Sequence, residues 1–386
     1  MSYLDHMSHG PRFDALCQQA ASESLVFEAQ RKLSPDYARA LAYENMFRLF
    51  APKDAGGPAE SLPIGLHKIE TLARFDAASA WVSMIGSTAS LTGAFLDQST
   101  ARTVFGGEAA INCGIFAPNG RAYEDGDDVI LTGRWAWASG SANADWIGLG
   151  ALLLDGPSGP LETAKMRLVM VPREHLIFHD TWHTLGLCAT SSGDVEVRNA
   201  RIPKAYMCSI IGNQPRIDAP LYRLPYFGFL ALGVAACALG NAYSCLQDFE
   251  SLAIEKTPSA SSRPLAEQGR VQMSYAEAMA GYKAARAFYA TTIDITWERA
   301  QADGGTFSPD QRAELRLAAT YAVRTCADVV RSIYDLAGGS SVYNANIIQK
   351  RLRDAETMTQ HMIAAAQTYE LVGRVALGGY TPNMQL

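Results

Sequence analysis

The chain has 386 residues, of which 48% are hydrophobic and 19% charged, and its formal net charge is −6. This composition is typical of a globular protein, is long enough for two or three domains, and excludes an intrinsically disordered chain. No run of five or six basic residues occurs, so a nucleic-acid partner is not expected.

The amino terminus and the cysteines both favour a cytoplasmic location. Residues Met1 to His6 show no basic segment followed by an apolar one, so a secretory signal is not expected. The seven cysteines are scattered, form no Cys-x-x-Cys pair and suit a reducing compartment. No His-Glu-x-x-His motif is present, so no metal site is expected.

The amino-terminal part, residues 1–108, is predicted to be a helical domain. Ser34-Pro35-Asp36 combines an N-cap serine, a proline at the first helical position and an acidic first turn. It predicts a helix that continues to Phe50 and stops at Pro52. Further helices are predicted over residues 62–75, 76–94 and 99–105.

The central part, residues 109–215, is predicted to be a β domain with a sandwich-like or barrel-like arrangement. Short β-branched or apolar runs alternate there with Gly, Asp and Pro turns, which is typical of strands in such domains. The runs are 110–116, 128–132, 147–154, 167–171 and 195–197.

The carboxy-terminal part, residues 216–386, is predicted to be a four-helix bundle with helices over 225–254, 265–302, 308–337 and 347–376. Ser308 to Gln311 forms a capping box, and Gly338-Gly339 ends the third helix. The apolar run from Tyr226 to Gly240 is about 15 residues long, shorter than a membrane span of roughly 20. It predicts a buried helix, so no membrane partner is expected.

The stretch from Gly133 to Trp146 combines three tryptophans with a Ser-Gly-Ser step. Three indoles offer a large flat apolar area, while the hydroxyls and the glycine allow a polar ligand to come close. Two interpretations are open at this point. The stretch binds a planar, heteroatom-rich ligand such as a flavin, or it is an aromatic β-hairpin in a core.

The order of helices, β domain and helical bundle resembles the acyl-CoA dehydrogenase fold over nearly the whole chain. This resemblance implies an α+β fold class with an amino-terminal helical domain, a central β domain and a carboxy-terminal four-helix bundle. Three motifs carry it: 182–195, which resembles the second β-domain motif of that fold, the glycine pair in 335–341, and the Arg-Asp step in 349–354.

Two further segments resemble one branch of that fold, the reduced-flavin-dependent monooxygenases of two-component systems. They are Phe116-x-Pro118-x-Gly120-x-Ala122 and the stretch 133–146. Members of this branch hydroxylate phenols, indoles or sulfur heterocycles.

A residue near the carboxy terminus separates this branch from the dehydrogenases, which place a catalytic Glu eight residues after the aspartate of the Arg-Asp step. Here that aspartate is Asp354, and the eighth residue is Met362, which cannot accept a proton. His361 precedes it, at a position similar to that of a histidine in the monooxygenases. Glu370 lies more than two helical turns further on.

The resemblance implies catalytic roles for Ser139 and His361. The backbone N–H or the hydroxyl of Ser139 would face N5 and O4 of the flavin, and His361 would act as an acid or base. Two structural alternatives are open: an ordinary serine in a β-turn, and a helical histidine satisfied by a carbonyl or a carboxylate.

The resemblance also implies flavin contacts from several segments. Trp137 would shield a flavin face, with a core aromatic as the alternative, and Arg263 would approach a phosphate. The glycine pair would bring N–H groups to the pyrophosphate or adenine, or it is only a helix C-cap. The implied cofactor-binding residues are Trp137, Ser139, Thr190, Ser191, Arg263, Gly338, Gly339 and Ser340. Ser259 stands where the family usually has an earlier Arg, which leaves FAD and FMN both open.

Three positions are expected to bind substrate: Thr88, Asn143 and Met362. The monooxygenases often carry histidines at the position of Asn143 and around Thr88, where they commonly meet a phenolic hydroxyl. Their absence here favours a non-phenolic substrate such as an indole.

The leading hypothesis is an oxidoreductase, a two-component flavin-dependent monooxygenase. It would receive reduced FAD or FMN from a separate flavin reductase and oxygenate a small aromatic or heteroaromatic substrate through a flavin C4a-hydroperoxide. The small-residue helix around Gly228 to Gly240 and the glycine pair suggest a homotetramer. The alternatives are an acyl-CoA dehydrogenase or related flavin oxidase, and a non-catalytic scaffold, which would not need the Trp-rich and Ser-rich stretch.

Overall fold

The computed structural model describes residues 9–211, 214–259, 261–302, 304–382 and 386. The chain forms two compact units, each built from separate stretches. The first contains the residues up to Gly65, Trp81–His183 and Cys188–Arg223, and the second contains Leu66–Ala80, Thr184–Leu187 and Leu224–Leu386. The predicted order of helices, β-sheet and helices is confirmed.

The amino-terminal helices begin where the capping residues predict. Helix α2 starts after Ser34, whose side chain accepts a hydrogen bond from the backbone N–H of Tyr37. The predicted end of this helix is wrong, because α2 stops at Tyr43 instead of Phe50. Asn45 has a φ of 63°, in the left-handed region, which turns the chain out of the helix before Pro52. The helices are α1 Pro11–Gln30, α2 Pro35–Tyr43, α3 Leu62–Phe75, α4 Ala77–Ala89, the 3₁₀ turn Ser90–Phe95 and α5 Gln98–Phe105.

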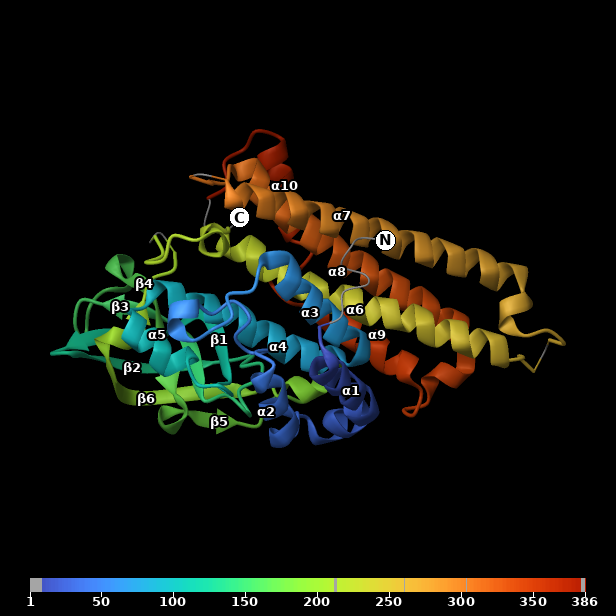
Figure 1. The fold of residues 1–386 in the computed structure, drawn as a ribbon, viewed down its shortest axis with the longest axis horizontal. Coiled ribbons are helices and arrows are strands. Elements are labelled where there is room, and N and C mark those ends of the chain that lie inside the picture. Colours follow the sequence, from blue (N-terminus) through green and yellow to red (C-terminus); the bar gives the residue numbers. More distant parts are fainter. Residues whose placement is uncertain (1–8, 212–213, 260, 303, 383–385) are drawn as a thin grey trace. The chain divides into compact units, whose positions relative to one another are not determined.

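The central strands join in one seven-stranded sheet with the order β5-β6-β2-β1-β3-β4-β7 (Figure 1). Every predicted strand run overlaps an observed strand. The strands are β1 Asn112–Asp125, β2 Asp128–Trp135, β3 Trp146–Leu154, β4 Lys165–Pro172, β5 Ile177–His179, β6 Asp194–Pro203 and β7 Met207–Cys208.

The stretch from Gly133 to Trp146 is not a β-hairpin, so that alternative is wrong. Strands β2 and β3 lie on opposite sides of β1, which pairs antiparallel with β2 and parallel with β3. Because β1 lies between them, the chain from β2 has to cross β1 before β3 begins. Residues 136–145 make this crossing as an irregular loop, which leaves their backbone and side chains free to build a site.

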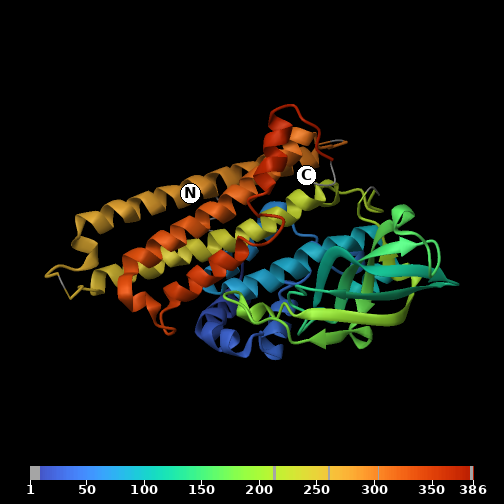
Figure 2. The ribbon, with the colours of Figure 1, turned by 180° about the vertical axis from the view of Figure 1, so that it is seen from behind.

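Helix α8 is the central helix of the second unit and contacts α6, α7, α9 and α10 (Figure 2). The capping box predicted at Ser308 and Gln311 is present, and α8 ends at Gly338 as expected. Helix α6 is long and apolar enough to cross a membrane by length and composition alone, but 94% of its most apolar window is buried in the protein. The helices are α6 Tyr226–Glu255, α7 Gly269–Gln301, α8 Pro309–Ala337, α9 Ile347–Met358 and α10 Thr368–Ala376.

Buried charges join residues 66–80 to the later helices of the same unit. Arg286 of α7 lies 2.8 Å from the Glu70 carboxylate. Lys350 of α9 lies 3.1 Å from Asp76 and 2.8 Å from Asp354. Burial alone would lower the pKa of Lys350, but the two carboxylates outweigh it and raise that pKa above its usual value.

The last predicted helical region, 347–376, is interrupted, and this corrects the expectation that His361 lies on a helix. Residues 359–367 form turns between α9 and α10. The buried guanidinium of Arg316, on α8, donates to the carbonyl of Ile363 at 3.0 Å. The Thr368 hydroxyl donates to the same carbonyl. That carbonyl is therefore satisfied by side chains, which explains why the helix does not continue.

Candidate functional site

The loop that crosses β1 is fixed to the segment before β6. The backbone N–H of Ala138 donates to the carbonyl of Gly193 at 3.1 Å, and that of Gly140 donates to the carbonyl of Thr190 at 2.8 Å. Gly140 has a φ of 83°, which favours glycine. These bonds bring two Ser-rich segments, about fifty positions apart in sequence, side by side in the first unit.

Three hydroxyl groups lie in a row where these segments meet. The Oγ of Ser192 lies 2.6 Å from the Oγ of Ser139 and 2.6 Å from the Oγ1 of Thr190. The indole N–H of Trp81, on α4, donates to Ser139 Oγ at 3.2 Å. We call Ser139, Ser192 and Thr190 the hydroxyl chain. All three side chains are buried, but Ser139 retains 7% exposure.

Trp137 lies two residues before Ser139 and has an unusual conformation. Its φ is 63°, and its side chain is 74% exposed. Trp135, in contrast, is fully buried and donates from its indole N–H to the carbonyl of Gly150 at 2.8 Å. The core-aromatic interpretation is therefore wrong for Trp137, and its exposed ring is available to cover a flat ligand.

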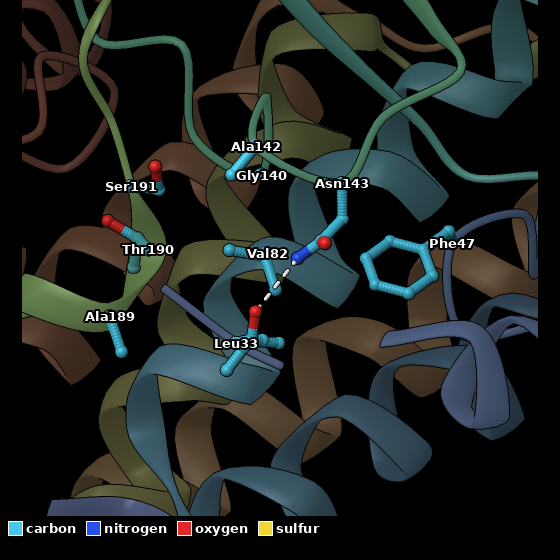
Figure 3. A pocket seen from close by; sticks show the side chains of 9 residues that line it. All are labelled: Leu33, Phe47, Val82, Gly140, Ala142, Asn143, Ala189, Thr190 and Ser191. Carbon is cyan, nitrogen blue, oxygen red and sulfur yellow. Dashed lines mark hydrogen bonds between the residues drawn. The ribbon is translucent and has the colours of Figure 1, made fainter. Parts of the chain in front are cut away.

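A small recess lies beside the loop. Figure 3 shows the hydroxyls of Thr190 and Ser191 on one side of it and the ring of Phe47 on the other. The amide of Asn143 donates to the carbonyl of Leu33 at 3.2 Å, so Asn143 is anchored within the first unit. The lining residues are Leu33, Phe47, Val82, Gly140, Ala142, Asn143, Ala189, Thr190 and Ser191.

Thr88 lies on α4, seven residues after Trp81, so both point to the same side of the helix. Its hydroxyl is buried and donates to the carbonyl of Met84 at 2.8 Å. Thr88 is not among the residues that line the recess, whereas Asn143 is.

His361 lies in the turns between α9 and α10 of the second unit. Its Nδ1 accepts the backbone N–H of Ile363 at 3.4 Å. Burial and the nearby positive charge of Arg316 lower the pKa of His361 to about 4, so the ring is neutral at pH 7. Because Nδ1 accepts, the neutral ring carries its proton on Nε2 and presents a donor there.

Neither Met362 nor Glu370, which follow His361 in the sequence, is suited to act as a substitute carboxylate base. Met362 is 75% exposed, so it is available for contact with a ligand. Glu370, on α10, is exposed and lies 2.5 Å from the guanidinium of Arg374. A solvated, paired carboxylate of this kind is a poor candidate for abstracting a carbon-bound proton.

The remaining predicted cofactor residues lie in the second unit. Gly338 has a φ of 64° and caps α8, as the structural alternative predicts. Ser340 Oγ accepts from Lys256 Nζ at 2.6 Å, and the same ammonium group donates to the carbonyl of Ala337. Arg263 is exposed in the loop after α6. The segment Gly338 to Ser340 therefore has a neighbouring cation in Lys256, which the sequence analysis missed.

Sequence analysis also missed Trp81, Ser192 and Arg316. Ser192 has a weak sequence signal, because it is the third hydroxyl residue in a row after Thr190 and Ser191. Trp81 and Arg316 have no such sequence signal, because each forms its hydrogen bond with a residue that is distant in the sequence. Among the described residues, no group of three or more His, Cys, Asp or Glu side chains is arranged to hold a metal ion.

The sequence is similar to flavin-dependent monooxygenases along most of its length. The model of the family "Acyl-CoA dehydrogenase, C-terminal domain" matches residues 232–366. The indole-3-acetate monooxygenase of Pseudomonas putida is 29% identical over 96% of this chain and 95% of its own length. The oxygenase component of the FADH2-dependent resorcinol hydroxylase of a Rhizobium species is 25% identical over 93% of this chain and 94% of its own.

Two solved structures share the fold at low sequence identity. The 3-HSA hydroxylase of Rhodococcus sp. RHA1 superposes with a TM-score of 0.89 at 20% identity, covering 98% of this chain and 100% of its own. XiaF from a Streptomyces species, in complex with FADH2 and glycerol, gives a TM-score of 0.87 at 22% identity, with 96% of each chain covered.

Proposed function

Because the chain belongs to the two-component flavin-dependent monooxygenases of the acyl-CoA dehydrogenase fold, we propose that it transfers one oxygen atom of O2 to a small aromatic or heteroaromatic substrate. An indole-like substrate is the specific proposal. It is supported by the similarity to an indole-3-acetate monooxygenase and by Asn143, which stands where the family resemblance implies a histidine in the phenol-hydroxylating members. Bound reduced flavin, FADH2 or FMNH2, supplies the electrons that activate O2.

The residues of the first unit fit a flavin ring. A large exposed indole, that of Trp137, lies two positions from the hydroxyl of Ser139, and Gly140 lets the backbone between the two Ser-rich segments come close. An aromatic face and nearby hydroxyl groups match the flat apolar body and polar edge of an isoalloxazine. This pairing of Trp137 with the hydroxyl chain is the observation that carries the proposal.

Each side chain has a proposed task. Ser139 binds the polar edge of the flavin, and Thr190 and Ser191 line the same edge. Trp137 covers one face of the flavin ring and excludes water from it, which prevents side reactions of reactive intermediates with water. His361, neutral at pH 7, holds an acceptor atom of the substrate by donating from Nε2. Asn143, Thr88 and Met362 remain proposed substrate positions. Arg263 and Gly338 to Ser340, with Lys256, are proposed for the flavin tail.

Transfer of oxygen from O2 is tested directly with isotope labelling. The protein is mixed anaerobically with photoreduced FAD or FMN and with indole-3-acetate or indole, and ¹⁸O2 is then admitted. The proposal expects a product that carries one ¹⁸O atom, detected by mass spectrometry. A product that also forms when hydrogen peroxide replaces the protein, or no labelled product from a panel of indoles and phenols, contradicts it.

A separate flavin reductase is the proposed partner. Support comes from the Rhizobium relative, which is named as an oxygenase component. With NADH and oxidised flavin alone, turnover is expected to be absent. It is expected to appear when an unrelated flavin reductase is added, because reduced flavin arrives by diffusion. A cytoplasmic location, where NADH is available, is part of the same proposal.

A further inference from the structure

A second set of hydrogen bonds fixes the loop that crosses β1 near its carboxy-terminal end. The Nη1 of Arg173 donates to the carbonyl of Ser141 at 3.0 Å and to the carbonyl of Ala144 at 2.9 Å. The backbone N–H of Arg173 donates to the carbonyl of Asp145 at 3.0 Å. One residue, directly after β4, therefore binds three carbonyls of the loop, and all of these residues lie in the first unit.

The guanidinium of Arg173 is held in a fixed orientation. Its central carbon lies 4.5 Å from the centre of the Phe178 ring, which belongs to β5, and such a contact orients the planar cation. A guanidinium is always charged in proteins, so its bonds to the two carbonyls are charge-assisted and stronger than ordinary ones. Arg173 thus presents a pre-oriented cation to the loop.

The bond from Arg173 to Ser141 acts on the turn that carries Ser139. The N–H of Ser141 donates to the carbonyl of Ala138 at 3.0 Å, which closes a four-residue turn with Ser139 and Gly140 at its centre. Ser141 is therefore held on both sides, by Arg173 at its carbonyl and by Ala138 at its N–H. A displacement of Ser141 would move Ser139, whose hydroxyl is proposed to bind the flavin.

Asp145 fixes the end of the loop without the side chain of Arg173. Its carboxylate accepts the N–H of Ile111 at 2.9 Å and pairs with both Nη atoms of Arg39, at 2.6 Å and 2.7 Å. Strand β3, which begins at the next residue, should therefore keep its start when Arg173 is replaced. Loss of the guanidinium is expected to loosen the turn around Ser139 and to leave the sheet intact.

We propose that Arg173 is a positioning residue that holds the turn from Ala138 to Ser141 in its flavin-binding conformation before the flavin arrives. A flavin that reaches a loose loop has to order that loop on binding, and this ordering lowers the affinity. Arg173 acts through the carbonyls of Ser141 and Ala144. The inference rests on the proposed function, since it requires a flavin beside Ser139.

Two variants separate the hydrogen bonds of Arg173 from its packing. Arg173→Met keeps an unbranched apolar stem beside Phe178 and removes the N–H donors. Arg173→Lys keeps a cation whose single nitrogen can donate to both carbonyls, as Nη1 does. Titration with dithionite-reduced FAD or FMN under argon should show about 10-fold weaker binding to Arg173→Met and nearly unchanged binding to Arg173→Lys. The expected loss is modest for charged hydrogen bonds because Arg173 is exposed.

Hydrogen exchange of the flavin-free protein measures the order of the loop directly. The amides of Gly140 and Ser141 should exchange about 10-fold faster in Arg173→Met than in the wild type, and Arg173→Lys should restore their protection. A role in stability alone would instead lower the unfolding free energy without a change confined to this loop. Arg201→Met is the matched control, because Arg201 is exposed on β6 of the same sheet and pairs with Asp128 at 3.0 Å.

Phe178→Leu covers a failure of Arg173→Met to fold, which circular dichroism would reveal. Phe178 is 39% exposed, and loss of its ring contact should weaken the binding of reduced flavin about threefold. Reduced flavin bound as tightly by Arg173→Met as by the wild type overturns the inference, and so does equal weakening in Arg201→Met. A wild-type protein that binds no reduced flavin refutes the proposed function itself and the inference with it.

Discussion

Trp135 and Trp137 lie two positions apart in the sequence but differ in environment and in role. Trp135 is fully buried and hydrogen-bonded, so it stabilises the sheet, whereas Trp137 has a left-handed backbone and a largely exposed ring. An exposed aromatic side chain in an uncommon backbone conformation adds little to stability. Such features tend to cluster at functional sites.

Substitution of the two tryptophans should separate binding from stability. Trp137→Ala is expected to change the free energy of unfolding by no more than about 0.5 kcal/mol, because the ring is exposed. It should weaken flavin binding about 10-fold through loss of the ring contact. Trp135→Ala should instead destabilise the fold by about 3–5 kcal/mol. Urea denaturation and flavin titration of both variants check this, and unchanged flavin affinity in Trp137→Ala would be evidence against its role.

Because the pKa of His361 is lowered in the folded protein, the free energy of unfolding should fall in mild acid. At pH 5 the unfolded chain protonates this histidine, while the folded protein, in which its pKa is about 4, does not. The unfolded state therefore binds more protons, and stability is lost as the pH falls from about 6.5 towards 4.

His361→Gln should remove this part of the acid sensitivity. Between pH 7 and pH 5 the wild type should lose at most about 2 kcal/mol more unfolding free energy than the variant, measured by urea denaturation at both pH values. His175→Gln, at an exposed position of the first unit, is the matched control and should behave as the wild type. Parallel losses in the wild type and His361→Gln would contradict the lowered pKa.

Helix α6 packs against α3 at one glycine, and this contact predicts the outcome of a helix substitution. A Cβ at Gly240 would lie 2.3 Å from the carbonyl oxygen of Glu70, so Gly240→Ala should cost about 1–3 kcal/mol despite the better helix propensity of alanine. A Cβ at Gly281 of α7 would meet its nearest atoms at 3.7 Å. Gly281→Ala should therefore stabilise the protein by up to about 1 kcal/mol. Thermal unfolding of the two variants should shift in opposite directions.

Element boundaries that depend on nearby residues were predicted well from the sequence. Boundaries that depend on distant contacts were predicted less well. The starts of α2 and α8 depend on Ser34 and Ser308, which act within a few residues and are readable in the sequence. The end of α2 depends on the left-handed Asn45, and the break before α10 depends on Arg316 from another helix. Periodicity alone carries no information about such tertiary hydrogen bonds.

The residues of the candidate site likewise divide into those with a local sequence signal and those that come together through distant contacts. Trp137 and Ser139 were identified from an unusual cluster of residue types within one stretch. Ser192 meets Ser139 because the sheet order places β2 next to β6, which no short motif encodes. Trp81 reaches Ser139 from helix α4, which no short motif encodes either. The hairpin alternative failed for the related reason that β1 lies between β2 and β3.

At the scale of the whole molecule, the second unit carries exposed apolar side chains that favour self-association. They are Ile254, Met273, Ile295, Val342 and Tyr343, each at least 59% exposed. Apolar side chains on a subunit surface are typical of oligomer interfaces. We therefore expect the homotetramer that the sequence suggested.

Light scattering after size exclusion should give a mass near four times that of the 41.7 kDa chain. Ile295→Glu should lower that mass, because a charge is costly in a buried apolar interface. Val26→Glu, on exposed α1, should leave it unchanged. A monomeric wild type at micromolar concentration would rule out the tetramer.

The second unit is built from separate stretches of the chain, and this limits where the gene can recombine with the genes of relatives. Glu70 and Asp76 lie upstream of the whole sheet, yet they pair with Arg286 and Lys350 of the late helices. A crossover at residue 224 alone would bring in helices from another lineage and leave these buried carboxylates beside mismatched partners, which costs about 3–5 kcal/mol for each broken pair. Viable hybrids should therefore inherit residues 66–80 and 224–386 from the same parent, although some 140 codons separate the two segments.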